Sequence, residues 1–183
     1  FGTRPLLTQE SPISAAWKHR LLTLKAGDVL LHRFSPTGFY SSAVKNPFLN
    51  ELEERSHHQV AFAHSAVGEH DTPFPVGARG RVVYLTAADK AKAESWVGQG
   101  FVEALRTPDS TLIFVTPDKA AEIRADQIAC MGCLSACLFS NWAQNEEGTT
   151  GKKADPRSFC IQKTLQDISH GAAVDTQLMF AGH

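Results

Sequence analysis

Three of the chain's four cysteines fall in one short stretch, ACMGCLSAC, at positions 129–137. If this stretch is helical, the C-x2-C-x3-C spacing puts Cys130, Cys133 and Cys137 on one face. They would then be small buried core residues, because free cysteine packs as a small hydrophobe. Sulfurs that share one metal lie roughly 4 Å apart, whereas seven helical residues span about 10 Å. A metal site therefore requires the backbone to curl, and Gly132 permits a curl without steric cost.

The fourth cysteine, Cys160, would return from a separate segment to complete a set of four thiolates. Four thiolates suit either zinc or an iron–sulfur cluster. Structural zinc sites usually carry two C-x2-C pairs, and this chain has one. We therefore predict that Cys130, Cys133, Cys137 and Cys160 converge on one metal site, and the spacing favours a 4Fe–4S cluster. Disulfides are the least favoured alternative, because a chain without an export signal usually keeps its thiols reduced.

Basic residues flank these cysteines, namely Lys152, Arg157 and Lys163. Such side chains could offset the thiolate charge of a cluster and raise its potential. They could equally be ordinary surface residues.

Two resemblances to known families come with these motifs. The stretch CMGCLSAC followed by a distant cysteine resembles the cluster-binding stretch of flavoenzymes related to dienoyl-CoA reductase and enoate reductase, whose fourth cysteine lies closer in sequence. The first residues, FGTRPLLTQES, resemble the segment GTRF-x-x-T-x-E of nitronate monooxygenases, although Pro5 replaces the usual aromatic residue. Longer stretches are similar to the C-terminal part of a bacterial subgroup of these NAD(P)H-dependent flavin oxidoreductases: TGFYSSAVKNPFL, GFVEALRTPD, ADPRSFCIQKTLQDISHG and DTQLMFAGH.

The second resemblance implies a TIM (β/α)8 barrel with FMN at the C-terminal ends of its strands. Gly2 and Thr3 would lie where the last barrel strand meets its helix and the FMN phosphate is held. Glycine lets backbone approach a phosphate and threonine offers N–H and hydroxyl donors; without the resemblance, a plain strand-to-helix turn explains the pair. Gln99, in VGQG, resembles the AGQ stretch near flavin in related proteins, or is a surface glutamine between two glycines.

The same resemblance places only the end of the barrel in this chain. Residues 1–26 would form its last strand–helix unit, residues 27–128 an α+β extension, and residues 129–183 the cysteine-ligated region with a C-terminal helix. The chain starts without Met and stops in an apolar run, which indicates an interrupted larger protein. We therefore expect a partner that supplies the missing N-terminal barrel half, in the same protein or in another chain. The family's usual catalytic histidine lies in that half, so the catalytic base is unknown.

Composition excludes several classes of protein. The 183 residues are 43% hydrophobic and 20% charged, and the formal net charge is −1, which is ordinary for a globular domain. We expect no nucleic-acid partner because no basic patch is evident, and no membrane span because no apolar run is long enough. The absence of an export signal predicts a cytoplasmic location.

Periodicity predicts a mixed α/β fold without the regular alternation of a doubly wound sheet. Expected helices run over residues 11–24 with Ser11 as N-cap, 46–55, 86–96, 116–127 and 159–171; expected strands are 28–34, 81–86 and 111–115. Residues 57–80 predict a loop, because glycine and proline are scattered through them.

Together these features predict part of an FMN-dependent oxidoreductase, nitronate monooxygenase-like or enoyl-reductase-like, with a 4Fe–4S cluster. It would use NAD(P)H to reduce a small-molecule substrate. The alternative is a non-catalytic, cysteine-ligated zinc module that docks onto a partner protein.

Overall fold

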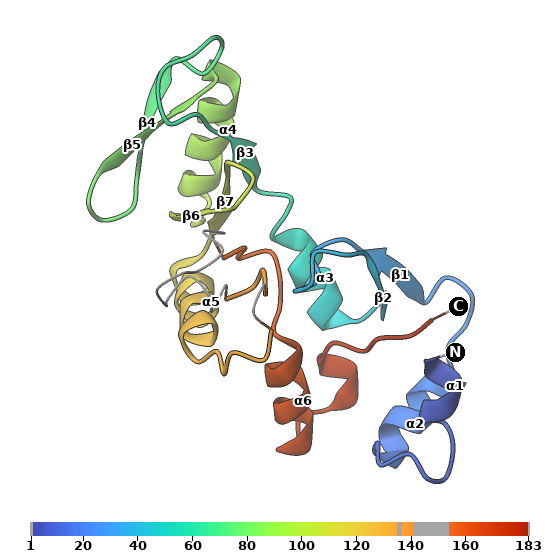
Figure 1. Cartoon of the computed structure of the whole chain (residues 1–183). Coiled ribbons are helices and arrows are strands. Elements are labelled where there is room, and N and C mark those ends of the chain that lie inside the picture. Colours follow the sequence, from blue (N-terminus) through green and yellow to red (C-terminus); the bar gives the residue numbers. More distant parts are fainter. Residues whose placement is uncertain (1, 135–136, 141–153, 183) are drawn as a thin grey trace. The chain divides into compact units, whose positions relative to one another are not determined.

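The computed structural model describes residues 2–134, 137–140 and 154–182 (Figure 1). The chain divides into two compact units. We call Phe1–Leu52 with Phe159–His183 the terminal unit and Glu53–Ser158 the central unit. The segment boundaries expected from the sequence, at residues 26 and 128, fall inside these units and not between them.

A small antiparallel sheet forms the middle of the terminal unit. Its strands are β1 (Val29–His32) and β2 (Ser41–Val44), joined through the SPTG turn. Residues 179–181 run along the other edge of β2, where the Val44 N–H donates to the Met179 carbonyl at 2.8 Å. A bridge between Ala43 and Phe180 extends the pairing. The C-terminal segment thus acts as a third strand of this sheet.

Helices cover both faces of this sheet. The terminal unit contains α1 (Thr3–Leu6), α2 (Ala15–Leu22), α3 (Pro47–Glu54, whose last two residues belong to the central unit), α6 (Ile161–Ser169) and the 3-10 turn η2 (Val174–Thr176). Successive strand residues point to opposite faces. On one face Val44, Met179 and Ala181 pack with Leu21 of α2, and on the other Ala43 and Leu178 pack with Leu49 and Leu52 of α3.

The central unit is built around strand β7, which is buried on both faces. Its elements are β3 (Gln59–Ala61), β4 (Thr72–Val76), β5 (Arg81–Leu85), α4 (Ala87–Gly98), β6 (Glu103–Arg106), β7 (Thr111–Val115) and α5 (Pro117–Ile128). The order β3–β7–β6 makes one antiparallel sheet and β4–β5 a separate hairpin. Leu112 and Phe114 of β7 pack on the side of α4, whereas Ile113 and Val115 pack with Ala120 of α5.

The caps and glycine stops predicted most helix boundaries correctly. Asn46, Thr86 and Thr116 begin α3, α4 and α5, and each side chain accepts the N–H three residues ahead. The first predicted helix is the exception. It begins at Ala15, and Ser14, not Ser11, accepts the Trp17 N–H at 3.3 Å. Ser14 lies three residues after Ser11, and the helix is shorter than predicted because it begins after this second serine.

The predicted loop over residues 57–80 is wrong, because it contains β3 and β4. Proline discouraged a strand prediction, yet Pro73 and Pro75 both lie within β4. A proline fits an outer strand when its missing N–H would have faced away from the neighbour. Among the described residues β4 pairs with β5 alone, so Pro73 and Pro75 leave the outer edge of the hairpin without two N–H donors.

The mixed α/β class is confirmed. Among the described residues the strands form three separate antiparallel sheets, and no barrel is closed. Every helix in the described part of the chain is too short or too polar to span a bilayer.

Candidate functional site

A shallow pocket of about 370 Å³ opens on the terminal unit beside the start of α1. Three stretches far apart in sequence form its wall: the start of α1, strand β2 and the C-terminal segment. The lining residues are Gly2, Thr3 and Leu6, then Ser42, then Phe180, Ala181 and Gly182. The volume lies at the lower end of the range for ligand pockets. Both residues that the resemblance implies for the FMN phosphate therefore line a pocket.

The polar groups at this pocket suit an anion. A Cβ atom on Gly2 would meet no atom of the surrounding protein within 4 Å, so packing does not require glycine there. Because α1 begins at Thr3, the N–H groups of Thr3 and Arg4 have no acceptor within the helix. The Thr3 hydroxyl adds a third donor. Open space at Gly2 with donors beside it fits the phosphate end of FMN.

Gln99, the third expected flavin contact, belongs to the central unit. It caps the C-terminal end of α4, is exposed, and its Nε2 donates to Ser95 Oγ at 3.2 Å. This local bond is what a surface glutamine makes, and a flavin contact of Gln99 stays a prediction.

The clustered cysteines do not lie on a helix. Helix α5 ends at Ile128, and residues 130–134 are irregular. The interpretation of the three cysteines as a stripe on one helix face is therefore wrong. Gly132 has a φ of 71°, the left-handed conformation expected at this glycine.

The cysteines differ in their surroundings. Cys133 is exposed, whereas Cys137 is buried. The Cys130 sulfur accepts hydrogen bonds from Ser140 Oγ at 2.8 Å and from the Gly132 N–H at 3.4 Å. Cys160 belongs to the terminal unit, where its sulfur caps α6 by accepting the Lys163 N–H at 3.4 Å.

A shared metal site needs at least three of these sulfurs together. Within the described ranges, no three His, Cys, Asp or Glu side chains are grouped so as to hold a metal ion. The four-cysteine site stays a prediction.

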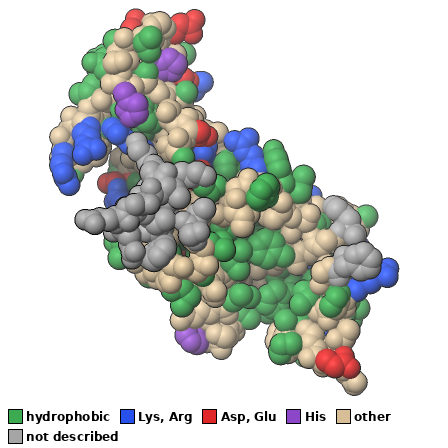
Figure 2. All heavy atoms as spheres, viewed as in Figure 1, with side chains coloured by type: hydrophobic (Ala, Val, Ile, Leu, Met, Phe, Trp, Pro, Cys, Tyr) green, Lys and Arg blue, Asp and Glu red, His purple; other side chains and the backbone are tan. Residues whose placement is uncertain are grey.

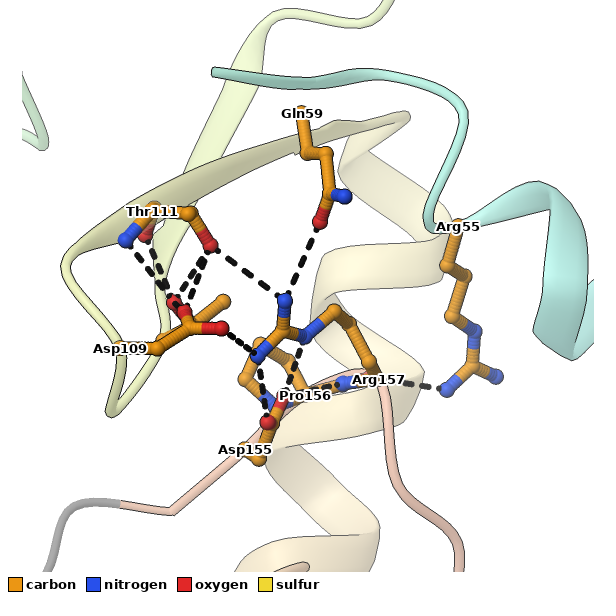
Figure 3. Close-up of polar contacts among 8 residues, drawn as sticks. Arg55, Gln59, Asp109, Thr111, Asp155, Pro156 and Arg157 are labelled. Carbon is orange, nitrogen blue, oxygen red and sulfur yellow. Dashed lines mark hydrogen bonds and ion pairs between the residues drawn. The ribbon is translucent and has the colours of Figure 1, made fainter. Parts of the chain in front are cut away.

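A polar cluster in the central unit surrounds Arg157 (Figure 3). Its guanidinium binds Asp155 with two hydrogen bonds, of 2.9 and 2.8 Å, and Asp109 with one of 2.9 Å. Gln59 Oε1 lies at 3.1 Å and Thr111 Oγ1 at 3.5 Å. Arginine has five N–H donors, and each is directed at an acceptor. Arg157 is therefore not a surface residue, and its effect on a cysteine cluster stays a prediction; Lys152 lies outside the described residues.

Electrostatics in this cluster favour the charged forms. Burial alone raises the pKa of Asp109, but hydrogen bonds from Thr107, Arg157 and Thr111 outweigh it and bring the pKa below its usual value. The Arg157 side chain is 3% exposed and that of Asp109 is 52% exposed. Because the guanidinium has no donor left for a ligand, we assign this cluster to structure. It ties the segment around residue 157 to the start of β7.

Other surface features carry less chemistry. Figure 2 shows Lys and Arg side chains gathered at the turn of hairpin β4–β5; Arg79 lies in that turn and Arg81 is the first residue of β5. It also shows hydrophobic side chains gathered over the part that holds α3 and the β1–β2 hairpin. On that hairpin Leu31, Phe39 and Tyr40 are mostly exposed.

Sequence reasoning missed Ser42 and residues 180–182 as pocket residues. Strand β2 and the third strand carry no motif that predicts their pairing, so only the tertiary structure brings them to Thr3. Comparison of the chain with protein-family models, with curated proteins and with solved structures found no match.

Proposed function

We propose that this chain is part of an FMN-dependent oxidoreductase and supplies the site for the flavin phosphate. The observation that carries the proposal is the pocket at Gly2 and Thr3. The motif that resembles the nitronate monooxygenase family, GTR, places its Gly–Thr pair at that pocket.

The chain's own contribution is binding and orientation. Thr3 and the first N–H groups of α1 would hold the phosphate, and Gly2 would let it approach the backbone. When bound, FMN accepts a hydride from reduced nicotinamide and passes electrons to a small organic substrate. Fixing the phosphate end sets where the reactive ring lies, and that is the protein's part in such chemistry.

A covering partner is part of the same proposal. Phe39 is 78% exposed, and Leu31 and Tyr40 on the same hairpin are also mostly exposed. Large apolar side chains exposed together favour an interaction surface. We propose that the N-terminal half of the flavin barrel, in the same protein or a second chain, covers this hairpin.

No step of the proposed function uses the cysteines. A 4Fe–4S cluster or a zinc ion on Cys130, Cys133, Cys137 and Cys160 would need sulfurs that the described residues do not group. The alternative function, a zinc module, depends on the same four sulfurs and has no observation in its favour. Metal and sulfide analysis of protein purified without oxygen would test both.

The test of the flavin proposal compares FMN with riboflavin, which lacks the phosphate. The chain is produced together with the N-terminal part, and binding is followed by quenching of flavin fluorescence. Gly2→Ala should weaken FMN binding by about tenfold or more, because the new methyl occupies space that the phosphate needs. Riboflavin binding should change little.

Gly98→Ala is the matched control. A Cβ on Gly98 also meets no atom within 4 Å, and neither glycine has a positive φ. This variant should bind FMN as the wild type does. Equal FMN and riboflavin affinities in the wild type, or an unaffected Gly2→Ala variant, would remove the phosphate site and with it the proposal.

A further inference from the structure

We infer that the C-terminal segment completes a phosphomonoester site, with Gly182 positioning the Thr3 hydroxyl and Ser42 adding a second one. The inference rests on the proposed function and deepens it. It adds one binding residue, Ser42, and one residue that positions the Thr3 hydroxyl, Gly182.

The first step is the direction of the Thr3 hydroxyl proton. The Gly182 N–H donates to Thr3 Oγ1 at 3.0 Å. A hydroxyl has one donor and two acceptor lone pairs, so this contact occupies an acceptor position and leaves the O–H to donate. Because Thr3 is the first residue of α1, no preceding helical turn offers the hydroxyl a carbonyl. The proton is therefore available to a ligand oxygen in the pocket.

The second step is the placement of Ser42. Alternate residues of a strand share a face, so the Ser42 side chain points to the same side as that of Val44. Val44 packs in the cluster that includes Leu6 of α1, and Leu6 and Ser42 both line the pocket. The Ser42 hydroxyl thus lies on the pocket side of β2.

The third step is that one segment contacts both residues that carry the hydroxyls. The Ala181 N–H donates to the Ser42 carbonyl at 3.2 Å, and the next residue, Gly182, donates to Thr3. Two successive N–H groups of one extended stretch therefore join β2 to the start of α1. Fixed donors bind an anion with little loss of side-chain freedom.

The charge of the wall agrees with an anionic ligand. Among the described residues that line the pocket there is no acidic side chain, and Leu6, Phe180 and Ala181 provide its apolar part. A phosphomonoester has oxygens that can accept from two hydroxyls at once, and hydrogen bonds to a charged acceptor are the stronger kind. The ligand class is therefore a phosphomonoester such as the phosphate of FMN.

The experiment measures FMN and riboflavin affinities of the chain with its N-terminal part, for wild type and variants. Thr3→Val and Ser42→Ala should each weaken FMN binding by about tenfold to a hundredfold, since each removes a hydrogen bond to a charged group. Thr3→Ser should restore most of the affinity. Riboflavin affinity should stay within about twofold of the wild type. Thr8→Val, in the same unit with its hydroxyl bonded to the Pro5 carbonyl, is the matched control and should bind FMN normally.

The positioning role of Gly182 needs its own variant. Gly182→Pro removes the N–H that donates to Thr3 Oγ1. It should weaken FMN binding in the wild-type background but not in Thr3→Val, because Gly182 acts through the Thr3 hydroxyl and that hydroxyl is already absent there. Additive effects of the two changes would refute the positioning role. Thermal unfolding of each variant shows whether the terminal unit remains folded.

Inorganic phosphate separates failure of this inference from failure of the proposed function. Its titration is followed by NMR at the amides of Thr3 and Gly182, in the wild type and in Ser42→Ala. Shifts with phosphate but no binding of FMN would support the phosphomonoester site and overturn the flavin function. Tight FMN binding that Thr3→Val and Ser42→Ala leave unchanged would overturn the inference alone. No response to either probe would overturn both.

Discussion

The Arg157 cluster and the Gly2–Thr3 pocket are both built from polar groups, and they use them in opposite ways. In the cluster each of the five guanidinium N–H groups is directed at an acceptor, and the side chain is buried. At the pocket the Thr3 hydroxyl accepts one N–H and keeps its own proton, and Gly2 faces open space. The first arrangement leaves nothing for a ligand, whereas the second leaves donors directed at a cavity.

The comparison shows how charge alone can mislead. Arg157 is the most strongly paired charged group described above, yet its pairing is complete, which indicates structure. None of the described residues on the pocket wall is charged, yet the Thr3 hydroxyl there keeps its proton free to donate, which is why the pocket is the candidate site. A polar group is a candidate site when its hydrogen-bonding capacity is partly unused and solvent can reach it.

The largest expected effect is on stability and comes from breaking the Arg157 cluster. Arg157→Met should lower the free energy of unfolding by about 3–5 kcal/mol, because the buried Asp155 carboxylate loses its ion-pair partner. Urea denaturation followed by circular dichroism measures the change.

Arg124→Met is the control for that measurement. Arg124 pairs with Glu103 at 2.8 Å, but both side chains are substantially exposed, so the loss should stay below about 1 kcal/mol. If the two variants lose the same stability, the Arg157 cluster is not the structural centre that its geometry indicates.

A smaller effect on stability is expected from removing the hydroxyl of Ser14, and Ser11 provides the comparison. Ser14 Oγ accepts the Trp17 N–H, so Ser14→Ala should cost about 1 kcal/mol of stability. Ser11 Oγ is buried and has no partner among the described residues. Ser11→Ala should therefore be neutral or slightly stabilising. A larger loss for Ser11→Ala in thermal unfolding would restore Ser11 as the helix cap that the sequence predicted.

The pH dependence of stability should report on Asp109. Its pKa is lower in the folded chain than in the unfolded chain, where an Asp side chain has a pKa of about 3.9. Its contribution is then fully present above that value and is lost as the pH falls through the lower folded value. Half of the side chain is exposed, so solvent screening keeps the effect under about 1 kcal/mol. Asp109→Asn should flatten the acid side of the stability curve, and an unchanged curve would show that Asp109 does not contribute.

The smallest expected effect separates the cysteines from a metal site. Cys133 is exposed and belongs to no described metal group, so Cys133→Ala should change stability by less than about 0.5 kcal/mol. Protein purified without oxygen is the material to use. A loss of several kcal/mol that a chelator reproduces in the wild type would instead establish the four-cysteine metal site.

Local signals in the sequence determined three helix starts and the buried strand β7. Asn46, Thr86 and Thr116 each cap a helix as predicted, because a cap depends only on its own side chain and the first turn of the helix that follows. The apolar run over residues 111–115 is a strand buried on both faces, as its composition suggests. Gly2 and Thr3 line the pocket, and the resemblance had singled them out as a pair because they are neighbours in a short motif.

Tertiary structure alone decided the rest. Strand β4 tolerates its two prolines because it lies at the outer edge of a hairpin. The sequence of residues 57–80 does not reveal that position. Ser42 and Gly182 meet Thr3 through pairings that span most of the chain, and no local pattern encodes such partners. Arg157 looks like any basic residue in sequence, and only its burial among acceptors from three segments gives it a role. Interactions within one or two helical turns can be predicted from neighbouring residues, whereas interactions between distant segments depend on how the whole chain packs.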